Sequence, residues 1–323
     1  MDVTVRPKVV FLVYDSRSGS TLLASQIAKN LDRVLVTPEI GFDELLQRGD
    51  EFCRRNSSSA ITSLLIRKRD FINLGIAPAV LDSWFAEHGH PQGIRHYIEQ
   101  VCGCLLAQQS KDGEVVIVKN GSHARYIPRL VEAFGEDLRI LHIFRDPRAV
   151  VNSKNRTPRP YYPYETMGWG GVALSAWRWV CYSRVMRRAI TQGVSVYEIS
   201  YENFLADPKA ILAGLAEFLG VGISDVPSRN DYVIPSKEKT VHARVHSGTF
   251  DGDRSVAWRQ ELQSGDLKRV EAVSQTEMIL RGYEPTRLLS MVQRCMTVAS
   301  AVPDAISKSL RHYCLQLLKR NYL

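Results

Sequence analysis

A short polar turn near the N-terminus has the composition of an anion-binding loop. Residues 14–21 read Tyr-Asp-Ser-Arg-Ser-Gly-Ser-Thr. An apolar run at residues 9–13 precedes them and predicts a buried strand, while Leu23, Ile27 and Leu31 follow at the spacing of a helix face. The turn therefore leads into a helix N-terminus, where free backbone N–H groups and the positive end of the helix dipole favour a phosphate or sulfate.

The turn departs from the nucleotide-triphosphate loop G-x-x-x-x-G-K-[ST] at two positions. Tyr14 stands at the first glycine and Ser20 at the lysine, whereas Gly19 and Thr21 match. Without a lysine to reach the β- and γ-phosphates the loop is poorly suited to ATP or GTP, but Arg17 provides a planar cation for oxyanions. An ordinary serine-rich connection between a strand and a helix is the alternative interpretation of these residues alone.

A second segment carries another potential anion site. Residues 138–144 predict a strand, and Arg145 follows it directly. Pro147 suits the first turn of a helix, and Ser153 lies about two turns further along. Because open α/β sheets bind ligands at the carboxyl ends of their strands, Arg145 and Ser153 are expected to meet one anion there.

Taken together, the two segments resemble the sulfotransferase family. Residues 16–23 are similar to its 5′-phosphosulfate loop, and residues 144–153 are similar to its 3′-phosphate motif, including the spacing of eight from Arg145 to Ser153. Further landmarks follow in the family's order over most of the chain: residues 201–208, where Asn203 replaces the usual Asp, residues 218–220, Trp258-Arg259 and Gly282-Tyr283.

The resemblance implies an α/β fold in three layers, a parallel sheet with helices on both faces, as in P-loop nucleotide triphosphatases. It implies the donor 3′-phosphoadenosine 5′-phosphosulfate (PAPS), the product adenosine 3′,5′-bisphosphate (PAP), in-line transfer of a sulfuryl group, and no metal. The implied donor-binding residues are Arg17, Ser18, Gly19, Ser20, Thr21 and Leu22 at the 5′ end, Arg145 and Ser153 at the 3′-phosphate, and Tyr201 near the adenine. Arg17 would also stabilise charge on the leaving phosphate, while Leu22 stands where cytosolic family members carry an aromatic residue.

Three side chains are candidates for the chemistry at the acceptor, which needs a base. Glu39 resembles in placement the catalytic glutamate of bacterial sulfotransferases that act on trehalose, although a surface carboxylate after Pro38 is the alternative. His123 is the second candidate, but cytosolic family members carry Lys-x-His and here Gly121 takes the position of that histidine. Lys119 matches the lysine of that motif and would offset charge on the transferring group.

The composition is that of a globular protein with a moderate excess of positive charge. The chain has 323 residues, 45% apolar and 24% charged, with a net charge of +8. We expect no nucleic-acid partner, since there is no long basic tract or recognisable nucleic-acid motif. Neither a signal peptide nor a membrane span is expected, and the six cysteines form no zinc-site spacing, which favours reduced thiols in the cytoplasm.

Alternation of strands and helices predicts a parallel sheet covered on both faces, and the resemblance implies a single sulfotransferase domain over residues 1–323. The expected strands are residues 9–14, 34–37, 115–119, 138–144 and 194–200. A helical insertion at about 42–110 would form part of the acceptor site. An aromatic loop is expected at 155–171, either as a surface connection or as a lid that contacts the acceptor. In the helix expected at 173–190, Trp177 and Trp179 would be core or packing residues and not a binding site, and His142 would lie in the core. A loop at 235–253, with Arg244 and His246, would close over the nucleotide.

The C-terminal tail, at about 288–323, is amphipathic and basic. It predicts a packed helix pair, with a homodimer surface or a peripheral membrane-surface helix as alternatives.

The acceptor class stays open at the level of the sequence. A small molecule, a carbohydrate, a lipid or a peptide would each be compatible with these motifs. A P-loop nucleotide kinase and an inactive nucleotide-binding protein are alternative functions. The first would need the lysine that Ser20 replaces, and the second would lack a working base.

Overall fold

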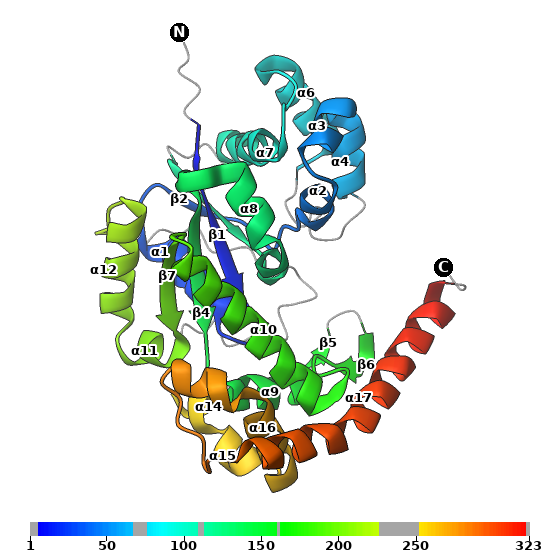
Figure 1. Cartoon of the computed structure of the whole chain (residues 1–323). Helices are drawn as coiled ribbons and strands as arrows, with labels where there is room; N and C mark the ends of the chain where they lie inside the picture. Colours follow the sequence, from blue (N-terminus) through cyan, green and yellow to red (C-terminus); the bar gives the residue numbers. More distant parts are fainter. Residues whose placement is uncertain (1–5, 67–75, 109–112, 160–161, 226–251, 321–323) are drawn as a thin grey trace.

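Five parallel strands form the centre of the molecule (Figure 1). In the computed structural model, which describes residues 6–66, 76–108, 113–159, 162–225 and 252–320, the sheet order is β2-β3-β1-β4-β7. The strands are β1 (Lys8–Tyr14), β2 (Val34–Val36), β3 (Val115–Lys119), β4 (Arg139–Phe144) and β7 (Ser195–Ser200). All four pairings are parallel, and the five predicted strands are confirmed to within one residue at each end.

Helices cover both faces of this sheet, as expected for an α/β fold. Because side chains alternate along a strand, Phe11 of β1 packs on one face and Leu12 on the other. One face carries α1 (Ser20–Asn30), α11 (Tyr201–Ala206) and α12 (Pro208–Leu219). The opposite face carries α7 (Ile94–Gln108), the short 3₁₀ helix η1 (Gly121–Tyr126), α8 (Ile127–Phe134) and, after η2 (Gly135–Asp137), α10 (Gly171–Thr191). The predicted three-layer arrangement is therefore confirmed.

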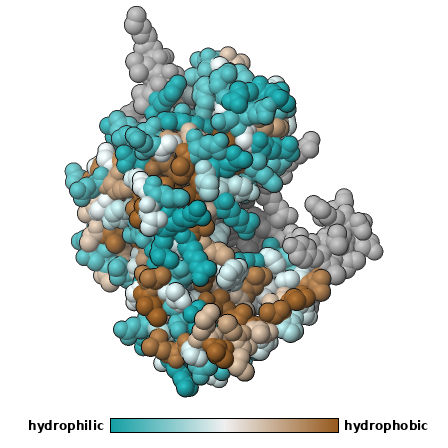
Figure 2. All heavy atoms as spheres, in the orientation of Figure 1, coloured by the Kyte–Doolittle hydropathy of each residue, from teal (hydrophilic) through white to brown (hydrophobic). Residues whose placement is uncertain are grey.

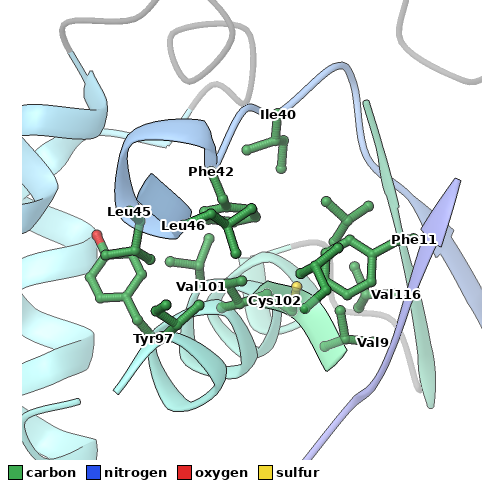
Figure 3. Packing of buried hydrophobic residues seen from close by; sticks show 14 of the residues in the cluster. Val9, Phe11, Ile40, Phe42, Leu45, Leu46, Tyr97, Val101, Cys102 and Val116 are labelled. Atoms are coloured by element: carbon green, nitrogen blue, oxygen red, sulfur yellow. The ribbon is translucent and has the colours of Figure 1, made fainter. Parts of the chain in front are cut away.

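The segment between β2 and β3 is helical, as the sequence predicts. It contains α2 (Asp43–Arg48), α3 (Asp50–Arg55), α4 (Ser58–Ile66), α6 (Pro78–His88) and α7. Phe42, Leu45 and Leu46 from its first part pack with Tyr97 and Val101 of α7 in the same apolar cluster as β1 (Figure 3). The inserted helices therefore extend the core of the sheet.

The aromatic segment after α9 (Pro147–Arg156) differs from the expected loop. It contains an antiparallel hairpin of β5 (Pro158–Arg159) and β6 (Tyr162–Thr166), because Met167 returns to donate its N–H to the Thr157 carbonyl at 2.8 Å. The helix predicted after it is confirmed as α10, but only one of its two tryptophans lies in the core. Trp177 is 50% exposed, whereas Trp179 is 2% exposed, since residues two apart point to different sides of a helix.

The described residues from 252 onward form four helices. They are α14 (Asp253–Val256), α15 (Trp258–Glu261), α16 (Ser264–Leu280) and α17 (Met291–Arg320). The predicted C-terminal helix pair is wrong, because one 30-residue helix runs through Pro303. Contacts of α17 with α10 and α16 offset the backbone hydrogen bond that a proline removes.

The outer side of this C-terminal region is apolar. Figure 2 shows apolar side chains gathered over the lower part of the molecule, where Figure 1 places α14 to α17. Met291 and Val292 are among the exposed residues. In the parts of the chain that the structure describes, no helix is long and apolar enough to cross a lipid bilayer. Arg244 and His246 lie outside the described residues.

Candidate active site

The turn between β1 and α1 has a backbone shape that depends on its glycine. Gly19 precedes α1 with a φ of 91°, and Arg17 also has a positive φ, 73°. A Cβ atom on Gly19 would lie 2.2 Å from Cδ2 of Tyr201, so the tyrosine ring packs directly on the turn. This contact places Tyr201, the first residue of α11, against the predicted 5′ loop.

Arg145 and Ser153 both contact this turn. Arg145 follows β4, and its Nη1 donates to the carbonyl oxygen of Arg17 at 3.3 Å. Its guanidinium carbon lies 4.4 Å from the centre of the Tyr201 ring. The Nε of Arg17 donates to Oγ of Ser153 at 3.0 Å. The structure thus brings together the residues that the sequence assigns to the two ends of one ligand.

The turn places two positive charges where an anion could bind. Burial, and then the nearby Arg145 charge, lower the pKa of Arg17 to about 10. Neither guanidinium forms an ion pair with a carboxylate in the described part of the chain. Oγ of Ser18 and Nε of Arg145 are buried without a hydrogen-bond partner there. Since buried polar groups are normally satisfied, these atoms fit the oxygens of a bound phosphate or sulfate.

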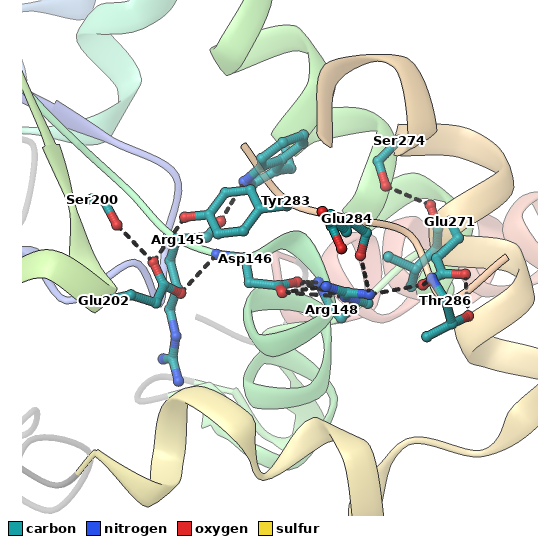
Figure 4. A network of polar contacts seen from close by, with 12 residues as sticks. Arg145, Asp146, Arg148, Ser200, Glu202, Glu271, Ser274, Tyr283, Glu284 and Thr286 are labelled. Atoms are coloured by element: carbon teal, nitrogen blue, oxygen red, sulfur yellow. Dashed lines mark hydrogen bonds and ion pairs between the residues drawn. The ribbon is translucent and has the colours of Figure 1, made fainter. Parts of the chain in front are cut away.

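A polar network fixes the backbone on which Arg145 stands (Figure 4). The indole Nε1 of Trp179 donates to the Arg145 carbonyl at 2.9 Å. The Asp146 N–H donates to Glu202 at 3.1 Å, and the Tyr283 hydroxyl donates to the same carboxylate at 2.8 Å. Two family landmarks, Glu202 and Tyr283, therefore act on the position of the predicted 3′-phosphate residue.

Arg148 joins α9 to the C-terminal helices. It pairs with Asp146 at 2.7 Å and with Glu271 of α16 at 2.9 Å. Its guanidinium carbon also lies 4.0 Å from the ring of Trp258, another landmark. Asp146 in turn accepts from the Arg148 N–H and caps α9. The C-terminal helices thereby hold the segment that carries Ser153.

A second polar cluster lies at the carboxyl ends of β1, β2 and β3. Nζ of Lys119 lies 3.0 Å from Oε1 of Glu39 and 3.0 Å from the Tyr14 hydroxyl, which itself donates to Glu39. Lys119 is 2% exposed, whereas the Glu39 side chain is 42% exposed. Burial, followed by the nearby Glu39 charge, raises the pKa of Tyr14 well above its usual value, so Tyr14 keeps its proton. Glu39 is therefore an accessible carboxylate held by a lysine and a tyrosine.

His123 lies apart from solvent. It is fully buried between the rings of Phe11 and Phe42, and its Nε2 accepts the N–H of Phe42 at 3.2 Å. Burial lowers its pKa to about 4, with Asp43 acting in the opposite direction. Its position is that of a neutral packing residue. His142 is likewise buried, as predicted, and contacts Glu198 at 2.9 Å.

Three residues, Tyr14, Asp15 and Lys154, form contacts at the site that the sequence did not predict. Tyr14 orients Glu39, and Asp15 forms a buried ion pair with Lys154 at 2.6 Å. Burial lowers the pKa of Lys154, and Asp15 counteracts this shift. The sequence shows only that both residues lie beside predicted site residues: Asp15 is in the turn, and Lys154 follows Ser153. The ion pair between Asp15 and Lys154 joins distant positions in the chain, so the sequence alone does not predict it.

Comparison with known proteins identifies the family of this chain. The profile of the sulfotransferase family matches residues 9–225. A solved sulfotransferase domain from the curacin biosynthetic pathway is similar, with 19% identity, a TM-score of 0.53, and coverage of 86% of this chain and 98% of that one. A sulfotransferase from Mycobacterium avium is 12% identical, with a TM-score of 0.47 and coverage of 87% and 79%. No curated protein sequence matches. Because the family profile spans more than half of the sequence, the chain belongs to the sulfotransferase family.

Proposed function

We propose that this protein transfers a sulfuryl group from PAPS to a hydroxyl or amine of a small-molecule, carbohydrate or lipid acceptor. One observation carries the proposal. Arg17 and Arg145 meet beside the Gly19 turn with no carboxylate partner among the described residues, next to the unsatisfied Oγ of Ser18. Two phosphate groups of one nucleotide suit such a pair of cations.

Each end of the donor has its own residues in this proposal. Arg145 and Ser153 bind the 3′-phosphate, and Tyr201 lies beside the adenosine. Arg17, the hydroxyls of Ser20 and Thr21, and the backbone N–H groups of residues 18–22 bind the 5′ end. Leu22 contributes only its N–H, since its side chain packs in the core. Fixed donors of this kind stabilise charge as it develops on the leaving phosphate.

Glu39 is the proposed base. Its carboxylate takes the proton of the acceptor hydroxyl while that oxygen bonds to sulfur. The bond from sulfur to the 5′-phosphate oxygen breaks, and PAP leaves with the electron pair. Lys119, 3.0 Å from Glu39, offsets negative charge at this point, and Tyr14 orients the carboxylate. The burial of His123 favours Glu39 over that residue.

The proposal is tested by offering PAPS and a small-molecule cell extract to the purified protein. We expect mass spectrometry to show new products heavier by one sulfuryl group. Adenosine 5′-phosphosulfate, which lacks the 3′-phosphate, is the matched control donor and should support little transfer. ATP turnover without sulfated products would support a kinase instead. Equal transfer from the two donors would show that no site for the 3′-phosphate contributes to the reaction.

A further inference from the structure

The long C-terminal helix α17 turns an apolar stripe toward solvent. We use the name α17 stripe for six exposed residues on one side of this helix: Val292, Met296, Ala299, Pro303, Ile306 and Leu310. Met296 is 69% exposed and Leu310 is 59% exposed. In Figure 2, apolar side chains follow the line that α17 takes in Figure 1.

The inner side of α17 has the opposite composition. Ala301 and His312 are buried there and Ala305 is partly buried, so the residues that face the body of the protein are small or polar. A helix on the surface of a monomer normally turns its apolar side toward the core. Because α17 turns that side outward, the stripe has the character of an association surface.

The spacing of the stripe is that of a helix that pairs with another helix. Its six residues follow one another at intervals of four, three, four, three and four. This is the a/d pattern of a heptad repeat, with two apolar positions in every seven, and it forms a narrow seam between two helices. From Val292 to Leu310 the seam is about 27 Å long, at a rise of 1.5 Å per residue.

The positions beside the stripe carry no charge between residues 291 and 310. They are Gln293, Ser300 and Ser307 on one side and Cys295, Val302 and Ser309 on the other. The charged residues of this stretch lie farther around the helix. There Arg294 donates to the Ala272 carbonyl at 2.9 Å, and Lys308 pairs with Asp304 at 2.9 Å.

This charge distribution favours a second copy of the chain over a lipid surface. A helix that lies on a bilayer carries lysine and arginine on the face beside its apolar side, where they meet anionic lipids. Neutral flanks lack that attraction. They suit contact between two identical copies, because no like charges are brought together along the seam.

We propose that this protein forms a symmetric dimer in which the α17 stripe packs against the same stripe of a second copy. A two-fold contact uses one surface twice, so a single self-complementary seam is sufficient. Contacts with α10 and α16, and the pairing of His312 with Glu165 at 2.8 Å, hold the stripe in place on each copy. A stable dimer buries about 1,200 Å² or more in total, and the exposed Leu288 and Met291 add apolar area at one end of the stripe.

Analytical ultracentrifugation over a range of protein concentrations is the first test. We expect the wild type to form a species of twice the 36.5 kDa of one chain, which dissociates on dilution. Met296→Glu and Ile306→Glu should each weaken the dimer by about 100-fold or more, because a carboxylate would be buried in the seam without a partner. A wild type that is monomeric throughout, or variants that dimerise as it does, would overturn the proposal.

Two control variants separate the seam from general effects of substitution. Ile306→Leu keeps the apolar surface and should dimerise within a few-fold of the wild type. Ile223→Glu places the same charge at another exposed apolar position, after α12, and should also dimerise normally. Circular dichroism should show that all four variants keep the fold, since each site is exposed. Equal loss of the dimer in Ile223→Glu would contradict a specific seam on α17.

Sedimentation with vesicles of phosphatidylcholine and phosphatidylglycerol tests the lipid alternative. We expect the wild type to stay in the supernatant. Binding to the vesicles that Met296→Glu abolishes would assign the stripe to a bilayer and overturn the dimer. None of these measurements depends on transfer of a sulfuryl group, so their outcome is independent of the proposed function.

Discussion

At the scale of single residues, the site depends on charges that the fold leaves without carboxylate partners. Arg17 and Arg145 are both largely buried, yet the hydrogen bonds of their guanidinium groups to described residues go to backbone and hydroxyl oxygens only. Glu39 is different, because Lys119 and Tyr14 hold it at the surface. The two arginines are therefore suited to binding an anion, and Glu39 is suited to accepting a proton.

Arg145→Ala should weaken the binding of PAP by about 10- to 100-fold, because it removes charge-assisted hydrogen bonds to a phosphate. Isothermal calorimetry with PAP measures this directly. Arg188→Ala removes the same charge from an exposed position on α10 and should leave the affinity unchanged. An affinity for PAP that survives Arg145→Ala would take this residue out of the donor site.

Glu39→Gln should lower the rate of product formation by about 10²- to 10⁴-fold, the usual contribution of a positioned base. The amide keeps the size of the side chain but cannot take the proton, so PAP affinity should remain near that of the wild type. Rates are measured on the sulfated product found in the extract experiment. Near-normal turnover would mean that another group removes the proton.

At the scale of elements, the site forms where segments that are distant in the sequence pack against one another. The Gly19 turn contacts α11 through Tyr201. Glu198 of β7 contacts His142 of β4 and Arg281, which follows α16. These contacts join parts of the chain that are distant in sequence. Changes at them should therefore alter both folding and ligand binding.

Gly19→Ala should destabilise the protein by about 1–3 kcal/mol and weaken PAP binding, because the new methyl group meets the Tyr201 ring. Gly193→Ala is a matched control, since Gly193 has a similar φ of 82° but no atom within 4 Å of the added Cβ. Thermal unfolding of both variants separates backbone strain from the ring contact. Equal losses in the two variants would show that the ring contact is unimportant.

Glu198→Gln should show the pH dependence of a paired carboxylate. Burial raises the pKa of Glu198, but hydrogen bonds from His142 and Arg281 outweigh it and lower the pKa to about 2 from 4.5. Because the folded-state pKa is lowered, the stabilisation is present above pH 4.5 and is lost as the pH falls toward 2.

We therefore expect Glu198→Gln to cost about 2 kcal/mol at pH 7 and much less at pH 3. Urea unfolding of the wild type and the variant at both pH values measures the difference. A difference that is independent of pH would mean that Glu198 acts through its shape and not through its charge.

At the scale of the whole molecule, one apolar cluster joins the sheet to the inserted helices. Phe42, which lies before α2, is fully buried in the same cluster as Phe11 of β1. The single domain predicted from the sequence stays a prediction, but this shared core gives it a physical basis. Burial that is shared between two parts of a chain makes them unfold together.

Phe42→Ala should therefore lower the stability of the whole protein by about 3–5 kcal/mol, the usual cost of removing a buried ring. Tryptophan fluorescence and near-ultraviolet circular dichroism should still follow one common transition in urea. Two separate transitions, with only one of them shifted, would show that the inserted helices fold as an independent unit.

The sequence by itself determined the strands and the family, and it located the two segments proposed to bind the donor. Strands such as β1 are buried on both faces and read as continuous apolar runs, and the turn before Leu22 has few alternatives to a helix N-terminus. Such local patterns can be recognised from the sequence alone. This is why the positions of Arg17, Arg145 and Ser153 could be predicted.

The tertiary structure alone decided which partners these residues have. The buried site of His123, the contact of Tyr14 with Glu39 and the exposure of Trp177 all depend on packing between distant segments. The sequence gives the charge of each side chain, but only the folded molecule determines which opposite charges lie beside it.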